Sequence, residues 1–157
     1  MALLTGDEVI EMAMRLEEDG ETFYNTAAEK ATTASIQSLF EDLAVQEQYH
    51  RRAFQQMGGG AVEFALSPEQ WEEFQAYTEA LLQNTFFAEP ESALNRAAEA
   101  QDERAALQAA LGFEKETLLF YHELRNVVRG AGKQKVDKII EEERQHIRRL
   151  SGLLSHC

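Results

Sequence analysis

The sequence contains two Glu-x-x-His motifs, Glu47–His50 and Glu143–His146, which combine side chains that bind metal ions. On an α-helix, residues three apart lie on one face, about 4.5 Å apart along the axis. Each motif therefore presents one carboxylate and one imidazole in the same direction. These ligands together suit iron or manganese, and zinc can replace either. The motifs predict the binding of divalent metal ions.

A lone glutamate precedes each motif at a nearly constant distance. Glu17 lies 30 residues before the glutamate of the first motif, and Glu114 lies 29 residues before that of the second. Each lone glutamate is followed at the same offset by a Phe-Tyr pair, which ends at Tyr24 in the first case and at Tyr121 in the second. The chain thus contains an internal repeat, in which two related segments carry the same pattern of residues.

The helical pattern places these residues at the middle of apolar stripes. In four long segments, apolar residues recur at intervals of three and four, as on the buried face of a bundle helix. The stripe positions are Ile10, Ala13, Glu17, Gly20, Tyr24, Ala27 and Ala31, then Ile36, Phe40, Leu43, Glu47, His50, Phe54 and Met57, then Leu107, Ala110, Glu114, Thr117, Tyr121, Leu124 and Val128, and finally Val136, Ile139, Glu143, His146, Leu150 and Leu153. Buried carboxylates are costly unless they are neutralised, and two divalent cations would neutralise four of them.

Glycine and proline residues divide the chain into the elements that must position this site. The pattern predicts helices at 7–30, 35–57, 68–83, from Pro90, 102–129 and 133–154. They form hairpin 1 over residues 5–57 and hairpin 2 over residues 102–155, joined by a long crossover over residues 58–101 that contains a short helix. No segment alternates with the period of a strand, so the predicted fold class is all-α, in one domain over residues 1–157.

Hairpin geometry brings the site residues to the same height. Residues equidistant from the turn of an antiparallel hairpin lie side by side. The first lone glutamate and its motif glutamate are centred on Thr32, in the first predicted turn. The second lone glutamate and its motif histidine are centred on Gly130, in the second turn. Each lone glutamate should therefore face its own Glu-x-x-His motif.

The charge of the chain limits its partners. Asp and Glu number 28 against 15 Lys and Arg, which gives a net charge of −13. Such a surface repels phosphate backbones and anionic lipid, so neither nucleic acid nor a membrane is an expected partner. No signal-peptide pattern or membrane-span pattern is found in the sequence, which predicts a cytoplasmic location. The single cysteine, Cys157, excludes an intrachain disulfide and a Cys-x-x-Cys metal site.

The lone glutamates, the Glu-x-x-His motifs and the Phe-Tyr pairs together resemble the di-iron domain of the rubrerythrin family, within the ferritin-like superfamily. The resemblance covers both hairpins and implies a ferritin-like four-helix bundle with one long crossover. It further implies two iron ions per chain, with manganese or zinc as substitutes. The implied metal ligands are Glu17, Glu47, His50, Glu114, Glu143 and His146. The motif glutamates would bridge the metals, each motif histidine would bind one metal, and the lone glutamates would be terminal ligands.

Two departures from the rubrerythrin pattern bear on function. The chain lacks the cysteines of a rubredoxin domain, which implies an external electron-donor protein such as a rubredoxin. Thr117 stands where typical rubrerythrins carry a further glutamate, so the ligand set is closer to bacterioferritin-like sites. The leading hypothesis is a non-haem di-iron oxidoreductase that reduces peroxide or dioxygen. The alternatives are an iron-binding ferroxidase or iron-storage-related protein, and a redox-silent metal-binding bundle.

Other residues near the predicted ligands have two interpretations each. The hydroxyls of Tyr24 and Tyr121 either hydrogen-bond a ligating carboxylate on a facing helix or have other core partners. The small residues Gly20 and Thr117 either leave a cavity for an exogenous oxygen species or permit close helix packing. The neighbouring acids are expected on the solvated surface: Glu18, Asp19, Glu116, Glu141 and Glu142.

Residues 67–87 of the crossover are rich in large apolar side chains. These are Trp71, Phe74, Tyr77, Leu81, Leu82, Phe86 and Phe87. They are expected to cover the flank of the bundle, or to form a dimer surface, or both. Because related bundles commonly dimerise, the expected oligomer is a homodimer.

Overall fold

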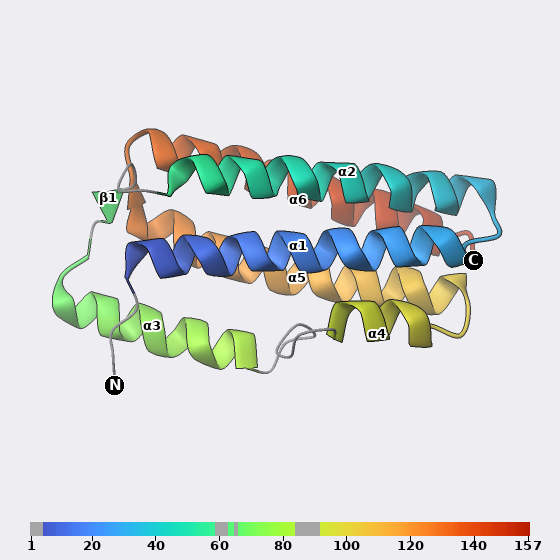
Figure 1. The fold of residues 1–157 in the computed structure, drawn as a ribbon, viewed down its shortest axis with the longest axis horizontal. Helices are drawn as coiled ribbons and strands as arrows, with labels where there is room; N and C mark the ends of the chain where they lie inside the picture. The colour runs from blue at the N-terminus through green and yellow to red at the C-terminus, as the bar shows by residue number, and fades with distance from the viewer. Residues whose placement is uncertain (1–4, 59–62, 65, 84–91) are drawn as a thin grey trace.

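Four long helices form the bundle in the computed structural model, which describes residues 5–58, 63–64, 66–83 and 92–157. Helices α1 (Gly6–Lys30) and α2 (Ala34–Met57) make one hairpin, and α5 (Glu103–Val127) and α6 (Ala131–Leu154) make the other. The four helices lie side by side along the long axis of the molecule (Figure 1). The predicted all-α class and the four-helix bundle of two hairpins are confirmed.

Side chains at the helix ends explain where the helices begin. The hydroxyl of Thr5 accepts a hydrogen bond from the backbone of Glu8, whose carboxylate accepts one from the backbone of Thr5, so α1 opens with a capping box. Asp102 caps α5 with a single hydrogen bond, which its carboxylate accepts from the backbone N–H of Ala105. Gly130 has a φ of +68° and α6 begins directly after it, two residues earlier than predicted.

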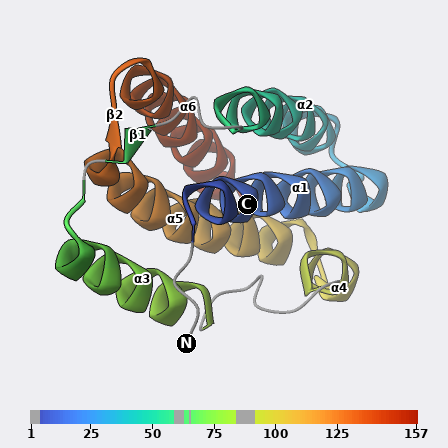
Figure 2. The same ribbon diagram turned by 60° about the vertical axis from the view of Figure 1, so that its left-hand side comes forward.

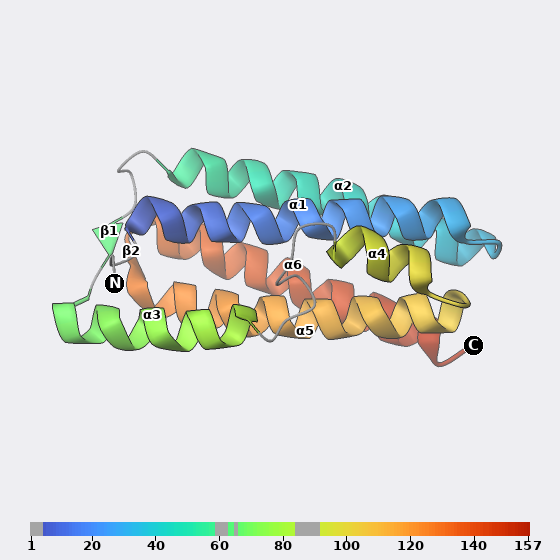
Figure 3. The ribbon, with the colours of Figure 1, turned by 60° about the horizontal axis from the view of Figure 1, so that its bottom comes forward.

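The described part of the crossover contains two helices and one short strand. Helix α3 (Pro68–Gln83) packs beside α5, and the short helix α4 (Ser92–Glu99) packs against α1 (Figures 2 and 3). Strand β1 (Glu63–Phe64) pairs antiparallel with β2 (Val128–Arg129), the link between α5 and α6. This two-residue ladder was not predicted, because a pair of residues is too short to show an alternating pattern. Phe86, Phe87 and Pro90 lie outside the described residues.

The end of the bundle opposite this ladder is held by side-chain contacts across the chain. The Nζ of Lys30 donates to the carbonyl oxygens of Ala97, Ala98 and Ala100 at 3.2, 2.6 and 2.9 Å, where α4 ends. A lysine suits this place because the last carbonyls of a helix lack partners within it. The α1–α2 turn is tied separately to the start of α5. There, the carboxylate of Glu103 accepts hydrogen bonds from the backbone N–H and the hydroxyl of both Thr32 and Thr33.

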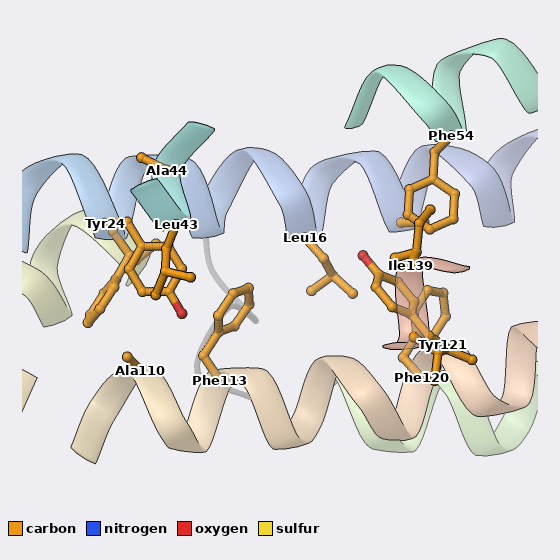
Figure 4. Close-up of a cluster of buried hydrophobic side chains, with 14 of the residues drawn as sticks. Leu16, Tyr24, Leu43, Ala44, Phe54, Ala110, Phe113, Phe120, Tyr121 and Ile139 are labelled. Atoms are coloured by element: carbon orange, nitrogen blue, oxygen red, sulfur yellow. The ribbon is translucent and has the colours of Figure 1, made fainter. Parts of the chain in front are cut away.

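The core of the bundle follows the predicted stripes. All the stripe positions are buried except Ala31 and Leu153, which are partly buried at the helix ends. Figure 4 shows Leu16 and Phe113 between Tyr24 and Tyr121, whose hydroxyl groups point toward the middle of the bundle. Each of the described helices is too short or too polar to cross a lipid bilayer.

Candidate metal centre

Two overlapping clusters of ligand-type side chains lie at the middle of the bundle. In each cluster, one donor atom per residue lies within 4.8 Å of the others. The first cluster is Glu17, Glu47, His50 and Glu143, and the second cluster is Glu47, Glu114, Glu143 and His146. All six residues predicted as ligands are thus brought together. The two motif glutamates belong to both clusters, whereas each histidine and each lone glutamate belongs to one.

The first cluster is arranged around the Nδ1 atom of His50. This atom lies 3.0 Å from Glu143 Oε1, 3.5 Å from Glu17 Oε2 and 3.6 Å from Glu47 Oε2. The three carboxylates come from three helices, α6, α1 and α2. Every one of these side chains is at most 2% exposed, so solvent does not screen the charges.

The second cluster repeats this arrangement around the Nδ1 atom of His146. This atom lies 2.8 Å from Glu143 Oε2, 3.4 Å from Glu114 Oε1 and 3.8 Å from Glu47 Oε1. The two imidazole rings are stacked, with centroids 5.6 Å apart. The sequence repeat is therefore a structural repeat, with the two histidines facing each other across the gap between α2 and α6.

The two tyrosines hydrogen-bond the lone glutamates across the bundle. The hydroxyl of Tyr24, on α1, donates to Glu114 Oε1 on α5 at 2.5 Å. The hydroxyl of Tyr121, on α5, donates to Glu17 Oε1 on α1. The structure therefore supports the first interpretation of these tyrosines, in which each hydroxyl hydrogen-bonds a carboxylate on a facing helix. The bond from Tyr121 leaves the second oxygen of Glu17, Oε2, directed at Nδ1 of His50. In the other pair, the same oxygen of Glu114, Oε1, accepts from Tyr24 and lies 3.4 Å from Nδ1 of His146.

Several buried atoms of the clusters make no hydrogen bond of good geometry among the described residues, although two of them, Glu143 Oε2 and His146 Nδ1, lie 2.8 Å apart. They are Glu17 Oε2, Glu47 Oε1, Glu114 Oε2, Glu143 Oε2 and His146 Nδ1. Buried polar atoms are normally paired, so a group of lone pairs facing one interior space requires an explanation. Divalent cations would satisfy all five atoms together, and the donor set of four carboxylates and two imidazoles fits two such ions.

The pKa values of the four glutamates separate into two pairs. Burial and repulsion from Glu143 raise the pKa of Glu47 well above its usual range, and the same two causes raise the pKa of Glu114 to about 8. Burial opposes the charge of Glu17 too, but attraction to His50 leaves the pKa of Glu17 below its usual value. Burial and the charge of Glu17 also oppose ionisation of Glu143, but hydrogen bonds from its neighbours lower its pKa. These shifts favour the ionised forms of Glu17 and Glu143 and the protonated forms of Glu47 and Glu114.

The two histidines supply the matching positive charge. Burial disfavours the imidazolium form, but the charge of Glu17 raises the pKa of His50 well above its usual range. Burial also disfavours the imidazolium form of His146, but the nearby carboxylates of Glu114 and Glu143 raise its pKa to about 10. Without metal, the site is thus close to neutral, with four protons in place of two divalent ions.

The space beside Gly20 is filled rather than open. A Cβ atom built on Gly20 would lie 2.8 Å from Cε1 of Phe113 and 3.3 Å from the carboxyl carbon of Glu47. Gly20 therefore permits close packing, which was one of its two interpretations. Thr117, at the corresponding place in the second repeat, is buried, and its hydroxyl has no hydrogen-bond partner among the described residues.

The expectation for Glu142 is wrong, because this residue is part of the site's surroundings. Its side chain is 33% exposed, and its Oε2 atom lies 2.7 Å from Nε2 of His50. That contact lowers the pKa of Glu142. Its position in the sequence could have indicated this contact, because Glu142 directly precedes the motif glutamate Glu143 on a helix that faces the first motif. Glu18 and Glu141 are exposed as expected, whereas Asp19 and Glu116 are partly buried.

Comparisons with known proteins agree with this arrangement. The Rubrerythrin family model matches residues 8–154. A crystal structure from Thermotoga maritima, of a protein described as ferritin-like and diiron-carboxylate, superposes with a TM-score of 0.68 at 23% identity and covers 99% of this chain and 97% of that one. At this identity the likeness concerns the fold alone. A search of curated proteins gives no match. Since the family model spans both hairpins and all six clustered residues, the chain belongs to the rubrerythrin family.

Proposed function

We propose that this protein is a non-haem di-iron oxidoreductase that reduces peroxide or dioxygen with electrons from an external donor protein. The observation that supports the proposal best is the pair of buried clusters that share Glu47 and Glu143. One iron ion would be held by the first cluster and the other by the second. The ions, when bound, supply one-electron steps between ferrous and ferric states, and two such steps provide the two electrons that reduce peroxide to water.

The chain's own side chains would keep this site rigid and dry. Tyr24 and Tyr121 hold the lone glutamates in place from opposite ends of the site. The ring of Phe113 fills the space next to Gly20 and excludes water from that side. A site held by packed helices in this way loses little free energy to reorganisation when the charge of the ions changes.

A ferroxidase or iron-storage-related function is the second candidate, and Thr117 is the observation in its favour. Rubrerythrin-type sites carry a further glutamate at this position, and the buried hydroxyl of Thr117 supplies no carboxylate. The symmetric set of six ligands is the kind that bacterioferritin-like sites use. Under this alternative ferrous iron is the substrate, and the protein needs no electron donor.

Anaerobic loading of metal-free protein with ferrous ion tests the proposal. We expect two iron ions per chain, and stopped-flow oxidation that is orders of magnitude faster with hydrogen peroxide than with dioxygen. Glu47→Ala should lose most of the iron, because Glu47 belongs to both clusters. Glu18→Ala is the matched control, since Glu18 is exposed beside Glu17 and belongs to neither cluster.

Each other result has a definite meaning. Zero or one iron ion per chain overturns the six-ligand site. Preferential oxidation by dioxygen with formation of a ferric mineral supports the ferroxidase alternative instead. Two bound ions that neither oxidant changes would make the protein a redox-silent metal-binding bundle.

A further inference from the structure

The two histidines of the centre differ at the ring nitrogen that faces away from the clusters. Nε2 of His50 lies 2.7 Å from a carboxylate oxygen of Glu142. In the described part of the chain, every ion pair of His146 involves its Nδ1 atom instead. Among the described residues, one imidazole therefore has a carboxylate behind it and the other does not, although the rest of the two clusters repeats closely.

The sequence repeat explains this difference. Glu142 directly precedes the motif glutamate Glu143, and the residue that directly precedes Glu47 in the first repeat is Gln46. A neutral amide thus occupies the place that corresponds to the carboxylate. Gln46 can donate or accept a hydrogen bond, but it cannot place a negative charge behind an imidazole.

The position of Glu142 allows it to act on His50 from the surface. Glu142, His50 and Gln46 all line a hollow of about 380 Å³ between α2 and α6. At the outer side of this hollow, Nζ of Lys138 lies 4.0 Å from Oε1 of Glu142, but Lys138 is 79% exposed. An exposed pair of this kind is weak, so the shorter contact with the buried imidazole determines the orientation of the carboxylate.

A carboxylate on the outer N–H of a ligating histidine fixes the ring and makes its other nitrogen a stronger ligand. We propose that Glu142 is a positioning residue that makes the two metal positions unequal, so that the first cluster binds a divalent ion more tightly than the second. This inference rests on the proposed metal-binding function. It goes beyond that function by assigning an order in which the two positions fill.

Calorimetric titration of metal-free protein with Co²⁺ tests the inference. Wild type should bind two ions in separate steps, with dissociation constants at least about tenfold apart. Glu142→Gln should weaken the tighter step by about 10- to 100-fold and leave the weaker step unchanged. Gln46→Glu is the mirror-image variant, and it should strengthen the weaker step by placing a carboxylate at the corresponding position of the repeat.

Proton NMR of the Co²⁺-loaded protein gives a readout that a general loss of stability would not move. The ring N–H of His50 should give a paramagnetically shifted signal that exchanges slowly with water, because Glu142 accepts its proton. Glu142→Gln should speed that exchange and leave the signal of His146 unchanged. Circular dichroism melting of the metal-free variants is the folding control, and Glu142→Gln should stay folded because the amide oxygen can still accept from Nε2 of His50.

The outcomes distinguish this inference from the proposed function. Two ions that bind wild type with equal affinity, or a Glu142→Gln variant with unchanged binding steps and unchanged proton exchange, overturn the inference and leave the di-iron proposal standing. A wild-type chain that binds no Co²⁺ and no ferrous ion overturns both.

Discussion

The six ligand-type side chains of the centre carry different charges when no metal is present. The lowered pKa values of Glu17 and Glu143 favour their ionised forms, and the raised pKa values of His50 and His146 favour the imidazolium forms that would balance them. The other two glutamates stay protonated because burial and neighbouring carboxylates raise their pKa values. An apolar seam can therefore contain this cluster without a bound ion, since no net charge is left uncompensated.

Metal binding should release protons. At pH 7 two divalent ions bind ionised carboxylates and neutral imidazoles, so they displace the protons of Glu47 and Glu114 and those of the two histidines, about four in all. Titration calorimetry in buffers of different ionisation enthalpy measures this number. A binding heat that does not depend on the buffer would contradict the charge states assigned to the metal-free site.

The two tyrosine hydroxyls should differ in their contribution to stability. Tyr121 donates to Glu17, which is charged, whereas Tyr24 donates to Glu114, which is protonated at neutral pH. Hydrogen bonds to charged acceptors are the stronger ones. In metal-free protein at pH 7, Tyr121→Phe should lower the free energy of unfolding by about 2–3 kcal/mol and Tyr24→Phe by about 1 kcal/mol. Urea unfolding measures both values, and the reverse order would contradict this assignment of charge.

The sequence predicts the residues of the centre to the extent that they repeat. The grouping of the six clustered residues follows from spacing, because spacing fixes which face of a helix a residue occupies. Spacing places the two tyrosines on the same faces but leaves open whether their hydroxyls contact a carboxylate, which the structure shows. The role of Glu142 does not follow from spacing within its own helix. It depends on how α6 is rotated against α2, and a stripe of apolar residues fixes that rotation only approximately.

At the scale of helices, Gly20 allows α1 to approach the aromatic ring of Phe113 and the carboxyl group of Glu47. Gly20→Ala should lower the free energy of unfolding by about 1–3 kcal/mol, because the new methyl group would overpack a rigid core. Gly112→Ala is the matched control. Gly112 lies within α5 with no atom in reach of a new Cβ, so alanine should raise stability there by about 0.5–1 kcal/mol.

Thermal melting of both alanine variants checks this prediction. A Gly20→Ala protein as stable as wild type, with unchanged metal affinity, would show that the close contact at α1 is unimportant.

Helix α4 should depend on Lys30 for its attachment. The three hydrogen bonds from Lys30 to Ala97, Ala98 and Ala100 satisfy carbonyls at the end of α4. Lys30→Met should lower stability by about 0.5–2 kcal/mol and speed amide hydrogen exchange in residues 93–100. Lys115→Met removes an exposed lysine from α5 and should do neither. Unchanged exchange in α4 would mean that the packing of its alanines alone holds the helix.

The helices were easier to predict from sequence than their contacts. The Ser67-Pro68 pair predicts the start of α3 to the residue, and the helix is described to Gln83, close to its predicted end. Nothing in the pattern shows that α3 packs beside α5 while α4 packs against α1. That choice depends on the path of the crossover, which the β1–β2 pairing and Lys30 constrain from opposite ends of the bundle.

For the whole molecule, the pKa shifts of the centre make stability depend on pH. The raised pKa of Glu114 contributes stability that is complete below about pH 4.5 and is lost as the pH rises to about 8. The raised pKa of His146 contributes stability that is lost between pH 6.5 and about 10. Both effects have the same sign, so the metal-free protein should lose stability from pH 6 to pH 9.

Metal should reverse this loss, because the ions bind the deprotonated ligands. Two equivalents of ferrous or manganous ion, at concentrations near 100 times the dissociation constant, should raise Tm by roughly 5–10 °C at pH 7.5 and by less at pH 5.5. Glu143→Ala should lose most of the increase. Anaerobic differential scanning calorimetry measures these shifts. An equal shift at both pH values, or in the variant, would mean that the ions bind elsewhere.

The internal repeat has a consequence for how such a centre can arise. One hairpin carries a lone glutamate, a Glu-x-x-His motif and a tyrosine for the opposite hairpin, which is half of the full arrangement. Two identical hairpins related by a two-fold axis would therefore assemble a complete centre, and duplication with fusion would turn that ancestral dimer into a single chain. Fusion frees each copy to diverge alone. On that origin, the pairs Gln46 and Glu142, and Gly20 and Thr117, would be positions where the two copies have diverged.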